Sequence, residues 1–394
     1  MTGCIYITGM GIISAIGDNV TQNLESLRQQ KSGIGPIKIL QSQFKNDYVA
    51  GEVGHTNRQL AKIAGMSTDL EYPRNTLLGI IAVNEAAEQA KFNVSDTIRT
   101  GLIAGTTVGG MDKTERFYYH LDKNIDFIQS HSCGSITEQI ADHLGIRHYV
   151  STYNTACSSS ANAIMFGARL IKQGLLDRAI VGGFDSLSKF TLNGFRSLFI
   201  LSETPCKPFD KNRTGLNLGE GAAFLVLESE GTLQITGNSP ICVLTGYANT
   251  NDAFHQTASS ENGEGAFLCM NQALKSANLN PDDIDYINLH GTGTVNNDLS
   301  EGMALKRLFG HNLPLFSSTK SFTGHTLGAA GAIEAVFSVL SLQNNFIFPS
   351  PGFEVPMDPE LIPVTRTRSF PGIKNIMSNS FGFGGNETTL IFSN

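Results

Sequence analysis

Short apolar runs that end in glycine recur along the whole chain and constrain its fold more than any other feature. Examples are RAIVGGFDSL, GEGAAFLVLES and YINLHGTGT. Such runs are nearly continuously apolar, which is typical of strands buried on both faces. Helical patterns lie between them, and alternating strands and helices indicate a layered α/β fold. The helices are predicted over 76–90, 136–144, 160–173, 265–277, 299–308 and 328–342.

A weak internal echo predicts a duplication. The opening IYITGMG and the later ICVLTGYA each read as an apolar strand closed by Thr-Gly. Each starts a stretch that holds a helical run and then a strand ending in glycine. We therefore expect two related halves, 1–240 and 241–394. No linker rich in proline, glycine and serine separates them, so they should pack as one body.

The low charge content limits the partners that the chain can have. Only 16% of the residues are charged, so much of the surface must be hidden in a large core or an oligomer interface. The net charge is −7 and no run is rich in lysine and arginine, which argues against nucleic acid or an anionic membrane. No apolar stretch reaches the roughly 18 residues of a membrane span.

The cysteines and the N-terminus indicate a cytoplasmic protein. The six cysteines are scattered without a C-x-x-C pair, which predicts neither a disulfide framework nor a metal site. No basic residue precedes Arg28, so the first segment reads as a strand and a turn and not as a signal peptide. A functional cysteine should therefore act alone, in a reducing cytoplasm.

Cys157 stands where an extended segment, VSTYNTA, changes to a helical pattern, SSANAIMFGARLIKQ. Small residues on both sides allow a sharp strand-to-helix turn. A thiol at this position would feel the positive end of the helix dipole and the free N–H groups of the first turn. We therefore expect a lowered pKa and a reactive thiolate. A buried structural cysteine is the alternative.

Two histidines also stand at the ends of predicted elements. His290 ends an apolar strand, and Asp298 and Glu301 follow it with the spacing of one helix face. His325 precedes an Ala/Gly-rich helix, with Lys320 five residues earlier. For each histidine the alternative is a structural role, in a hydrogen bond or a turn. Hydroxyl groups near His290 come from Thr292 and Thr294.

The C-terminal segment NSFGFGGNETT places one bulky ring, Phe383, in a glycine loop. Such a loop can swing, or it can offer backbone N–H groups to an oxyanion. A tight hairpin with a core phenylalanine is the alternative.

One cysteine and two histidines in these settings suggest a single thiol-based site. A cysteine hydrolase would use one histidine with an acid or an amide. Two histidines suit another task, because they can donate two hydrogen bonds to one carbonyl oxygen and stabilise an enolate as it forms.

Taken together, the ordered motifs resemble the elongating β-ketoacyl-acyl carrier protein synthases, which are condensing enzymes of the thiolase superfamily. TACSSS is similar to the nucleophile motif, HGTGT to the first histidine motif, KSFTGHTLGAAGAIE to the lysine-histidine motif and NSFGFGGN to the C-terminal loop. The resemblance spans nearly the whole chain. It implies a thiolase-like, duplicated, five-layered αβαβα sandwich that forms a tight homodimer.

The resemblance also implies a reaction. Cys157 would take an acyl group from acyl carrier protein as a thioester. A malonyl-acyl carrier protein would then lose CO2, and the resulting carbanion would attack the thioester to give a β-ketoacyl product. No cofactor is implied beyond the phosphopantetheine arm of the carrier, and no metal.

By the same resemblance, His290 and His325 support decarboxylation and hold the malonyl thioester oxygen. Lys320 would organise His325 through Glu301. The backbone N–H groups of Cys157 and Phe383 would form an oxyanion hole, and Phe383 would gate the acyl pocket. Further substrate contacts are implied for Thr292, Thr294, Phe381, Gly382, Gly384 and Val108.

The Cys-His-His pattern is that of the elongating members. Initiating synthases resemble Cys-His-Asn, and biosynthetic thiolases carry a second late cysteine, whereas no cysteine follows Cys269 here. Two other functions stay open: a non-catalytic partner of the chain-length-factor kind, which usually lacks the nucleophile, and an acyltransferase without decarboxylation. A heterodimer with a related subunit is the alternative to the homodimer.

Some positions depart from the family pattern. Thr214 stands where an acidic residue is usual, and Asn386 and Glu387 replace Thr and Asn. The acyl substrate could therefore belong to primary fatty acid synthesis or to a specialised polyketide or polyene. The carrier is acidic, so a basic patch is expected, with Lys207, Lys211 and Arg213 as candidates and Arg58 and Lys62 as alternatives.

Overall fold

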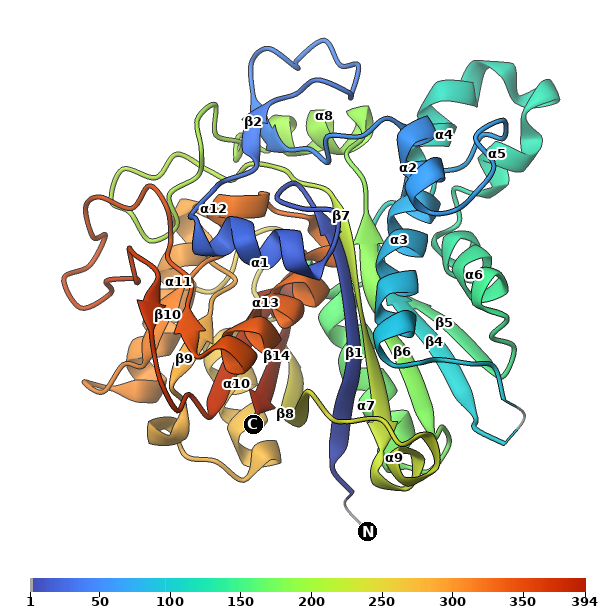
Figure 1. Ribbon diagram of the computed structural model, residues 1–394. Helices are drawn as coiled ribbons and strands as arrows, with labels where there is room; N and C mark the ends of the chain where they lie inside the picture. The colour runs from blue at the N-terminus through green and yellow to red at the C-terminus, as the bar shows by residue number, and fades with distance from the viewer. Residues whose placement is uncertain (1–2, 96) are drawn as a thin grey trace.

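The computed structural model describes residues 3–95 and 97–394. Its main sheet is made of two sets of five strands that lie side by side (Figure 1). The first set is β1 (Ile5–Ser14), β4 (Thr100–Gly105), β5 (Tyr149–Tyr153), β6 (Arg178–Asp185) and β7 (Gly221–Ser229). The second set is β8 (Cys242–Asn251), β9 (Tyr286–Asn288), β10 (Leu315–Ser317), β13 (Asn375–Phe381) and β14 (Asn386–Ser393).

The two sets repeat one topology. The strands lie in the order β5-β4-β6-β7-β1 in the first set and β10-β9-β13-β14-β8 in the second. When the strands of each set are numbered 1 to 5 along the chain, both sets have the same spatial order, 3-2-4-5-1. The first three strands of each order are parallel, and the last two pair antiparallel. The sets meet where β1 pairs with β8, through Tyr6 with Val243 and Ile7 with Cys242.

Helices lie between and outside the two sets of strands. The central layer holds α7 (Ser159–Lys172) and α13 (Ala330–Asn344), which contact each other and strands of both sets. On the outer faces, α3 (Arg74–Gln89) and α6 (Cys133–Leu144) cover the first set, and α10 (Glu264–Ala277), with α11 (Val295–Phe309) beside it, covers the second. The five-layered αβαβα sandwich expected from the resemblance is therefore present.

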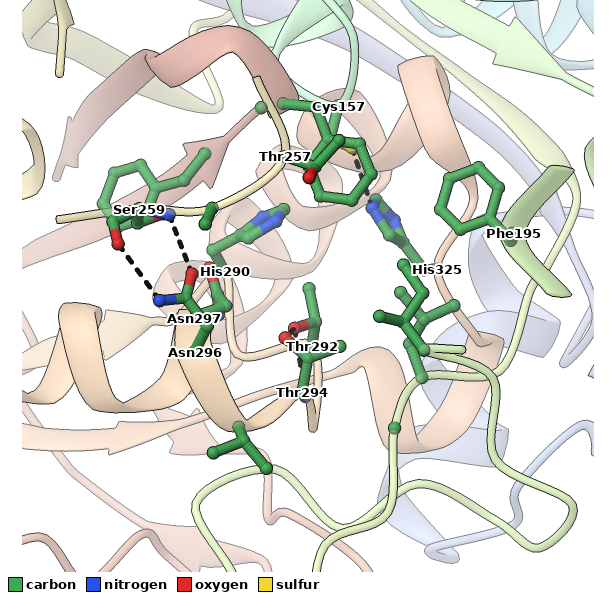
Figure 2. A pocket seen from close by; sticks show the side chains of 18 of the residues that line it. Cys157, Phe195, Thr257, Ser259, His290, Thr292, Thr294, Asn296, Asn297 and His325 are labelled. Atoms are coloured by element: carbon green, nitrogen blue, oxygen red, sulfur yellow. Dashed lines mark hydrogen bonds between the residues drawn. The ribbon is translucent and has the colours of Figure 1, made fainter. Parts of the chain in front are cut away.

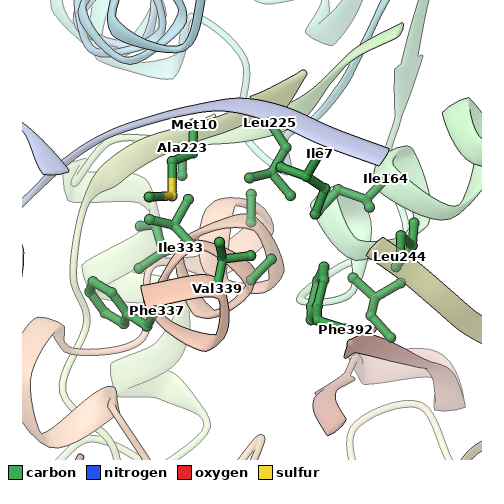
Figure 3. Close-up of a cluster of buried hydrophobic side chains, with 14 of the residues drawn as sticks. Ile7, Met10, Ile164, Ala223, Leu225, Leu244, Ile333, Phe337, Val339 and Phe392 are labelled. Atoms are coloured by element: carbon green, nitrogen blue, oxygen red, sulfur yellow. The ribbon is translucent and has the colours of Figure 1, made fainter. Parts of the chain in front are cut away.

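The main core lies in this central layer (Figure 3). Met10 on β1 and Leu225 on β7 extend into it from the first set of strands, and Phe392 on β14 from the second. Ile164 on α7 and Ile333 on α13 come from the two central helices. All five side chains are buried. Burying aliphatic and aromatic side chains of this size contributes about 1.5–3 kcal/mol each, so this layer is a main source of stability.

The remaining elements are short and surround the strands. The helices are α1 (Val20–Arg28), α2 (Asn57–Ile63), α4 (Met111–Phe117), α5 (Ile125–Gln129), α8 (Lys189–Ser197), α9 (Glu230–Thr236) and α12 (Lys320–Thr323). The short strands are β2 (Ile34–Pro36), β3 (Val49–Gly51), β11 (Phe346–Ile347) and β12 (Arg368–Ser369). The 3₁₀ turns are η1 (Tyr118–Lys123), η2 (Pro281–Asp283), η3 (Leu327–Ala329) and η4 (Phe383–Gly385). None of the helices in the described ranges is long and apolar enough to cross a bilayer.

All six predicted helices are present, and their ends differ by a few residues. The largest difference is at α11, which begins at Val295 and not at 299. Three polar residues, 296–298, follow Val295 in its first turn, so a clear apolar period starts only at Leu299.

Close packing of glycines sets the position of the central helices. A methyl group added at Gly105, the last residue of β4, would lie 2.3 Å from the backbone of Ser159 and Ser160 at the start of α7. Replacement of Gly105 by alanine is therefore expected to lower the free energy of unfolding by about 1–3 kcal/mol, measured by urea denaturation. Gly194→Ala on α8 is the matched control, because nothing lies within 4 Å of the added group. Equal stability of the two variants would contradict this account of the packing.

Candidate active site

Cys157 lies at the turn between β5 and α7, as the sequence predicts, and is 5% exposed. Ala156, directly before it, has a φ of 53°, in the left-handed region that residues with a side chain rarely adopt. This conformation makes the strand-to-helix turn sharp and directs the thiol into a cavity (Figure 2).

The structure brings the predicted cysteine and both histidines together. His325 Nε2 lies 3.0 Å from Cys157 Sγ. The rings of His290 and His325 meet edge to face, with centroids 5.4 Å apart. The sulfur and one nitrogen of each histidine all lie within 4.8 Å of one another. The three side chains come from different elements: Cys157 and His325 precede the two central helices α7 and α13, and His290 follows β9.

The expectation of a lowered Cys157 pKa is wrong. Burial raises the pKa of the thiol to about 11, although the Lys320 ammonium and a hydrogen bond from the Phe383 backbone N–H act in the opposite direction. Burial also holds the pKa of His290 and of His325 well below the usual range, and the charge of Lys320 adds to both shifts. The resting site at neutral pH is therefore a thiol beside two neutral imidazoles.

The raised thiol pKa predicts how alkylation of Cys157 depends on pH. A thiolate forms only as the pH approaches its pKa, so iodoacetamide labelling of this residue should rise about tenfold per pH unit from pH 7 to 10. Peptide mass spectrometry of Cys157 and of the exposed Cys4 in the same sample measures the profile against an internal control. A plateau of Cys157 labelling below pH 8 would contradict the raised pKa.

Lys320 contacts His290 rather than His325, which corrects the predicted role. Its Nζ lies 3.3 Å from His290 Nδ1, and it forms a buried ion pair with Glu334. An ammonium group can only donate, so Nδ1 of His290 accepts and its proton is on Nε2. His290 thus presents an N–H donor to the cavity.

Glu301 supports the backbone of the His290 loop and does not contact Lys320. Its carboxylate accepts the N–H groups of His290 (2.9 Å) and Gly291 (2.8 Å). One turn earlier on α11, Asp298 accepts the Gly293 N–H at 3.2 Å. The predicted shared helix face is therefore present, and both of its carboxylates hold the loop that carries His290. Burial raises the pKa of Glu301 to about 7.

The three side chains open into a cavity of about 290 Å³. The predicted contacts Thr292, Thr294, Phe381, Gly382 and Gly384 all line it. The hydroxyl groups of the two threonines are 2.8 Å apart and form a hydrogen bond with each other.

Val108 does not line this cavity, in contrast to the expectation. Its backbone N–H faces Asp185 at the end of β6, 3.4 Å from the carboxylate, and its side chain is buried. The residue lies behind the site, on the segment that follows β4.

Phe383 stands at the edge of the cavity on the glycine loop. Its ring stacks on Phe195 of α8, with centroids 6.0 Å apart and planes at 17°. Gly384 and Gly385 have φ values of 82° and 76°, which a residue with a side chain would adopt only under strain. The Gly384 N–H donates to Gln256 O at 2.8 Å, which ties the loop to the neighbouring segment.

The two departures from the family pattern, Asn386 and Glu387, have different surroundings. Asn386 Oδ1 accepts from Ser158 Oγ and Asn162 Nδ2, each at 2.8 Å, and so braces the turn of Cys157. Glu387 is buried beside Asp252, and burial raises its pKa to about 9, so it is a neutral acid at pH 7.

Three neighbours of the site were not singled out from the sequence. Glu334 is the ion-pair partner of Lys320, and a lone carboxylate in an otherwise apolar helix was a signal for it. Asp185 accepts the N–H of Gly328 (2.7 Å) and of Thr107 (2.9 Å), which fixes the turn after His325. Phe195 gives no sequence signal, because its stacking depends on the tertiary fold.

The basic residues that were predicted to dock the carrier differ in exposure and in their partners. Arg213 is buried and donates to backbone oxygens of Thr294 and Val295, and Lys207 pairs with Glu354 at 3.1 Å. The other three, which are Lys211 and, on α2, Arg58 and Lys62, are exposed, and none of the five lines the cavity.

One thiol and two imidazoles are also a donor set that zinc can use, and these three atoms are close enough to bind one ion. For a cofactor, hydroxyl and amide side chains of Thr257, Ser259 and Asn297 line the cavity, beside Asn296, whose amide is bonded to the Ser259 backbone (Figure 2). Such groups suit the amides and hydroxyls of a pantetheine arm.

Comparison with known proteins places these residues in a family. The model of the β-ketoacyl synthase N-terminal domain matches residues 3–232, and that of the C-terminal domain matches residues 241–354. A 3-oxoacyl-[acyl-carrier-protein] synthase 2 of Staphylococcus aureus is 34% identical, with 98% of this chain and 97% of that protein covered.

Solved structures of ketosynthases have a similar fold over the whole chain. The ishigamide ketosynthase/chain length factor has a TM-score of 0.90 and 27% identity, over 100% of this chain and 99% of that one. A type II polyketide synthase ketosynthase, in complex with its acyl-carrier protein and bound to the hexaketide, has a TM-score of 0.88 and 25% identity, over 100% and 99%. The chain therefore belongs to the β-ketoacyl synthase family of condensing enzymes.

Proposed function

We propose that this enzyme joins an acyl group held on Cys157 to a malonyl unit held on acyl carrier protein, with loss of CO2. The observation that carries the proposal is the 3.0 Å contact of His325 Nε2 with Cys157 Sγ, with His290 facing the same cavity. This arrangement provides a nucleophile, a base and a second N–H donor within reach of one substrate.

The first step is transfer of the acyl group. Cys157 Sγ attacks the carbonyl carbon of the acyl-carrier thioester while its proton passes to His325 Nε2, because the thiol has a pKa of about 11 and cannot ionise alone. Backbone N–H groups of Cys157 and Phe383 hold the oxyanion. The carrier sulfur then leaves and takes the proton from His325, which restores the neutral imidazole.

The second step forms the carbon–carbon bond. Once Cys157 is acylated, its sulfur has no proton for His325 Nε2 to accept, so His325 can adopt the tautomer with its proton on Nε2. The malonyl thioester oxygen then accepts the Nε2–H groups of His290 and His325, so that the enolate is stabilised as the bond to the carboxylate breaks and CO2 leaves. The carbanion attacks the Cys157 thioester, and collapse of the oxyanion releases the cysteine thiolate. The thiolate then takes a proton that reaches it from solvent through His325, which restores the resting thiol. His290 is suited to this step because Lys320 keeps its proton on Nε2.

Partners follow from the same chemistry. The relatives act with acyl carrier protein, and one structural neighbour is a ketosynthase with its acyl-carrier protein. We infer a homodimer, or a heterodimer with a related subunit, since another neighbour is named as a ketosynthase/chain length factor. We also infer that the enzyme works in a reducing cytoplasm, without a nucleic acid partner and without a cofactor other than the carrier's phosphopantetheine arm. Its two structural units are inferred to be residues 1–240 and 241–394.

The alternative functions fit the site less well. A chain-length-factor subunit needs no nucleophile, whereas Cys157 and His325 are held in hydrogen-bonding distance. An acyltransferase without decarboxylation would not need a second imidazole fixed as a donor by a buried lysine.

The test is a complete turnover. Purified protein is incubated with malonyl carrier and a series of acyl-acyl carrier proteins of increasing chain length, and both the Cys157 adduct and the β-ketoacyl product are weighed by mass spectrometry. The proposal predicts adduct and product together, and the best donor identifies the acyl chain. An adduct without a β-ketoacyl product would support the acyltransferase instead.

A further inference from the structure

The entrance of the active-site cavity is bordered by exposed apolar side chains. Phe199 lines the cavity and is 93% exposed, and Val295 lines it from the start of α11 and is 58% exposed. Soluble proteins bury large apolar groups, and an exposed apolar patch marks a surface that another molecule covers.

The patch continues from Val295 along α11. Leu299 and Met303 follow at intervals of four residues and are 47% and 41% exposed. Residues four apart lie above one another on a helix, so the three side chains form one stripe that runs outward from the cavity. The buried face of the same helix is formed by other residues, among them Glu301 and Leu305.

The backbone of Phe199 also indicates a function. Its φ is 58°, in the left-handed region, which is unfavourable for a bulky residue. The residue follows the last turn of α8, where its N–H donates to Arg196 O at 3.0 Å. A strained turn that holds a large apolar ring in solvent is not explained by stability.

We infer that the carrier protein docks through apolar contacts on this entrance surface, defined as Phe199, Val295, Leu299 and Met303. The inference rests on the proposed function, which requires a protein to sit over the entrance while its arm reaches Cys157. Phe199 and Val295 line the cavity itself, so a carrier whose arm enters the cavity sits beside this surface. Arg213 is buried and Lys207 is ion-paired, and although Lys211, Arg58 and Lys62 are exposed, no lysine or arginine of the described ranges lines the cavity. The side chains that border the entrance are therefore mainly apolar, which favours apolar contact as the main source of affinity.

The test separates docking from chemistry by the choice of acyl donor. The double variant Leu299→Ser/Met303→Ser changes two exposed residues outside the cavity lining, so folding should be retained. Acylation of Cys157 is measured with the best acyl-acyl carrier protein and with the same acyl group on N-acetylcysteamine, which lacks the protein. The value of kcat/KM for the carrier donor should fall about tenfold or more, with the small donor unchanged.

Ile235→Ser on α9 is the matched control, because Ile235 is an exposed aliphatic residue away from the cavity, and it should leave both donors unaffected. An electrostatic docking surface would show a steep loss of wild-type kcat/KM between 50 and 500 mM salt, whereas the apolar surface predicts a change within about twofold.

Four results would overturn the inference: equal rates of variant and wild type with the carrier donor, equal losses with both donors, the steep salt dependence, or a change in oligomeric state of the variant by light scattering, which would assign the stripe to a second copy of this chain. Failure of the wild-type protein to acylate Cys157 from either donor would instead overturn the proposed function as well.

Discussion

Replacement of Cys157 by alanine is expected to abolish both formation of the acyl adduct and synthesis of the β-ketoacyl product, by at least about 10³-fold. No other cysteine lines the active-site cavity, and Cys4 and Cys133 lie outside it. Cys206, Cys242 and Cys269 are buried, and burial raises the pKa of each well above that of an ordinary cysteine. Intact-protein mass spectrometry after incubation with acyl carrier substrate measures the adduct directly.

The fold should survive this change, because only the sulfur atom is removed from a site that borders a cavity. Circular dichroism and the oligomeric state by gel filtration should match those of wild type. Cys4→Ala, at an exposed cysteine, is the control and should retain full activity. An adduct that persists in the Cys157→Ala protein would assign the nucleophile to another residue.

Replacement of His290 by alanine is expected to separate the two half-reactions. Its Nε2–H donor is lost, so stabilisation of the enolate falls and release of CO2 should slow by about 10²–10³-fold. Acylation should be nearly unaffected, because the proton of Cys157 is taken by His325 and not by His290. Release of labelled CO2 from carboxyl-labelled malonyl carrier and the rate of adduct formation give the two values.

His290→Gln is the informative companion variant, since its side-chain amide can still donate a hydrogen bond and should restore part of the decarboxylation. Equal loss of both half-reactions in His290→Ala would point to a structural role of this histidine. A structural role can be measured separately. If His290 holds the buried Lys320–Glu334 ion pair in place, the His290→Ala protein should also have a lower melting temperature.

Sequence alone was sufficient for the elements with a long, regular pattern. α3, α7 and α13 were predicted because their apolar residues recur over many turns, and their buried faces match that pattern. Short helices such as α2 and α8 were missed, since two or three mostly polar turns give no reliable period.

The members of the site were predicted better than their environment. The turn at Cys157 and the loops of His290 and His325 follow from local residue types, but the pKa of the thiol does not. It depends on burial by segments far apart in the sequence, which outweighs the local effect of the helix end. The contact of Lys320 with His290 and its ion pair with Glu334 likewise join residues 30 and 14 positions apart.

A single-turnover experiment tests the central claim most directly. Acyl-Cys157 enzyme is freed of the acyl donor and mixed with malonyl carrier labelled in its carboxyl group. The account predicts that loss of the Cys157 adduct, release of labelled CO2 and appearance of the β-ketoacyl carrier are equal in amount and rate. Loss of the adduct as free acid, or release of CO2 without a new carbon–carbon bond, would contradict it.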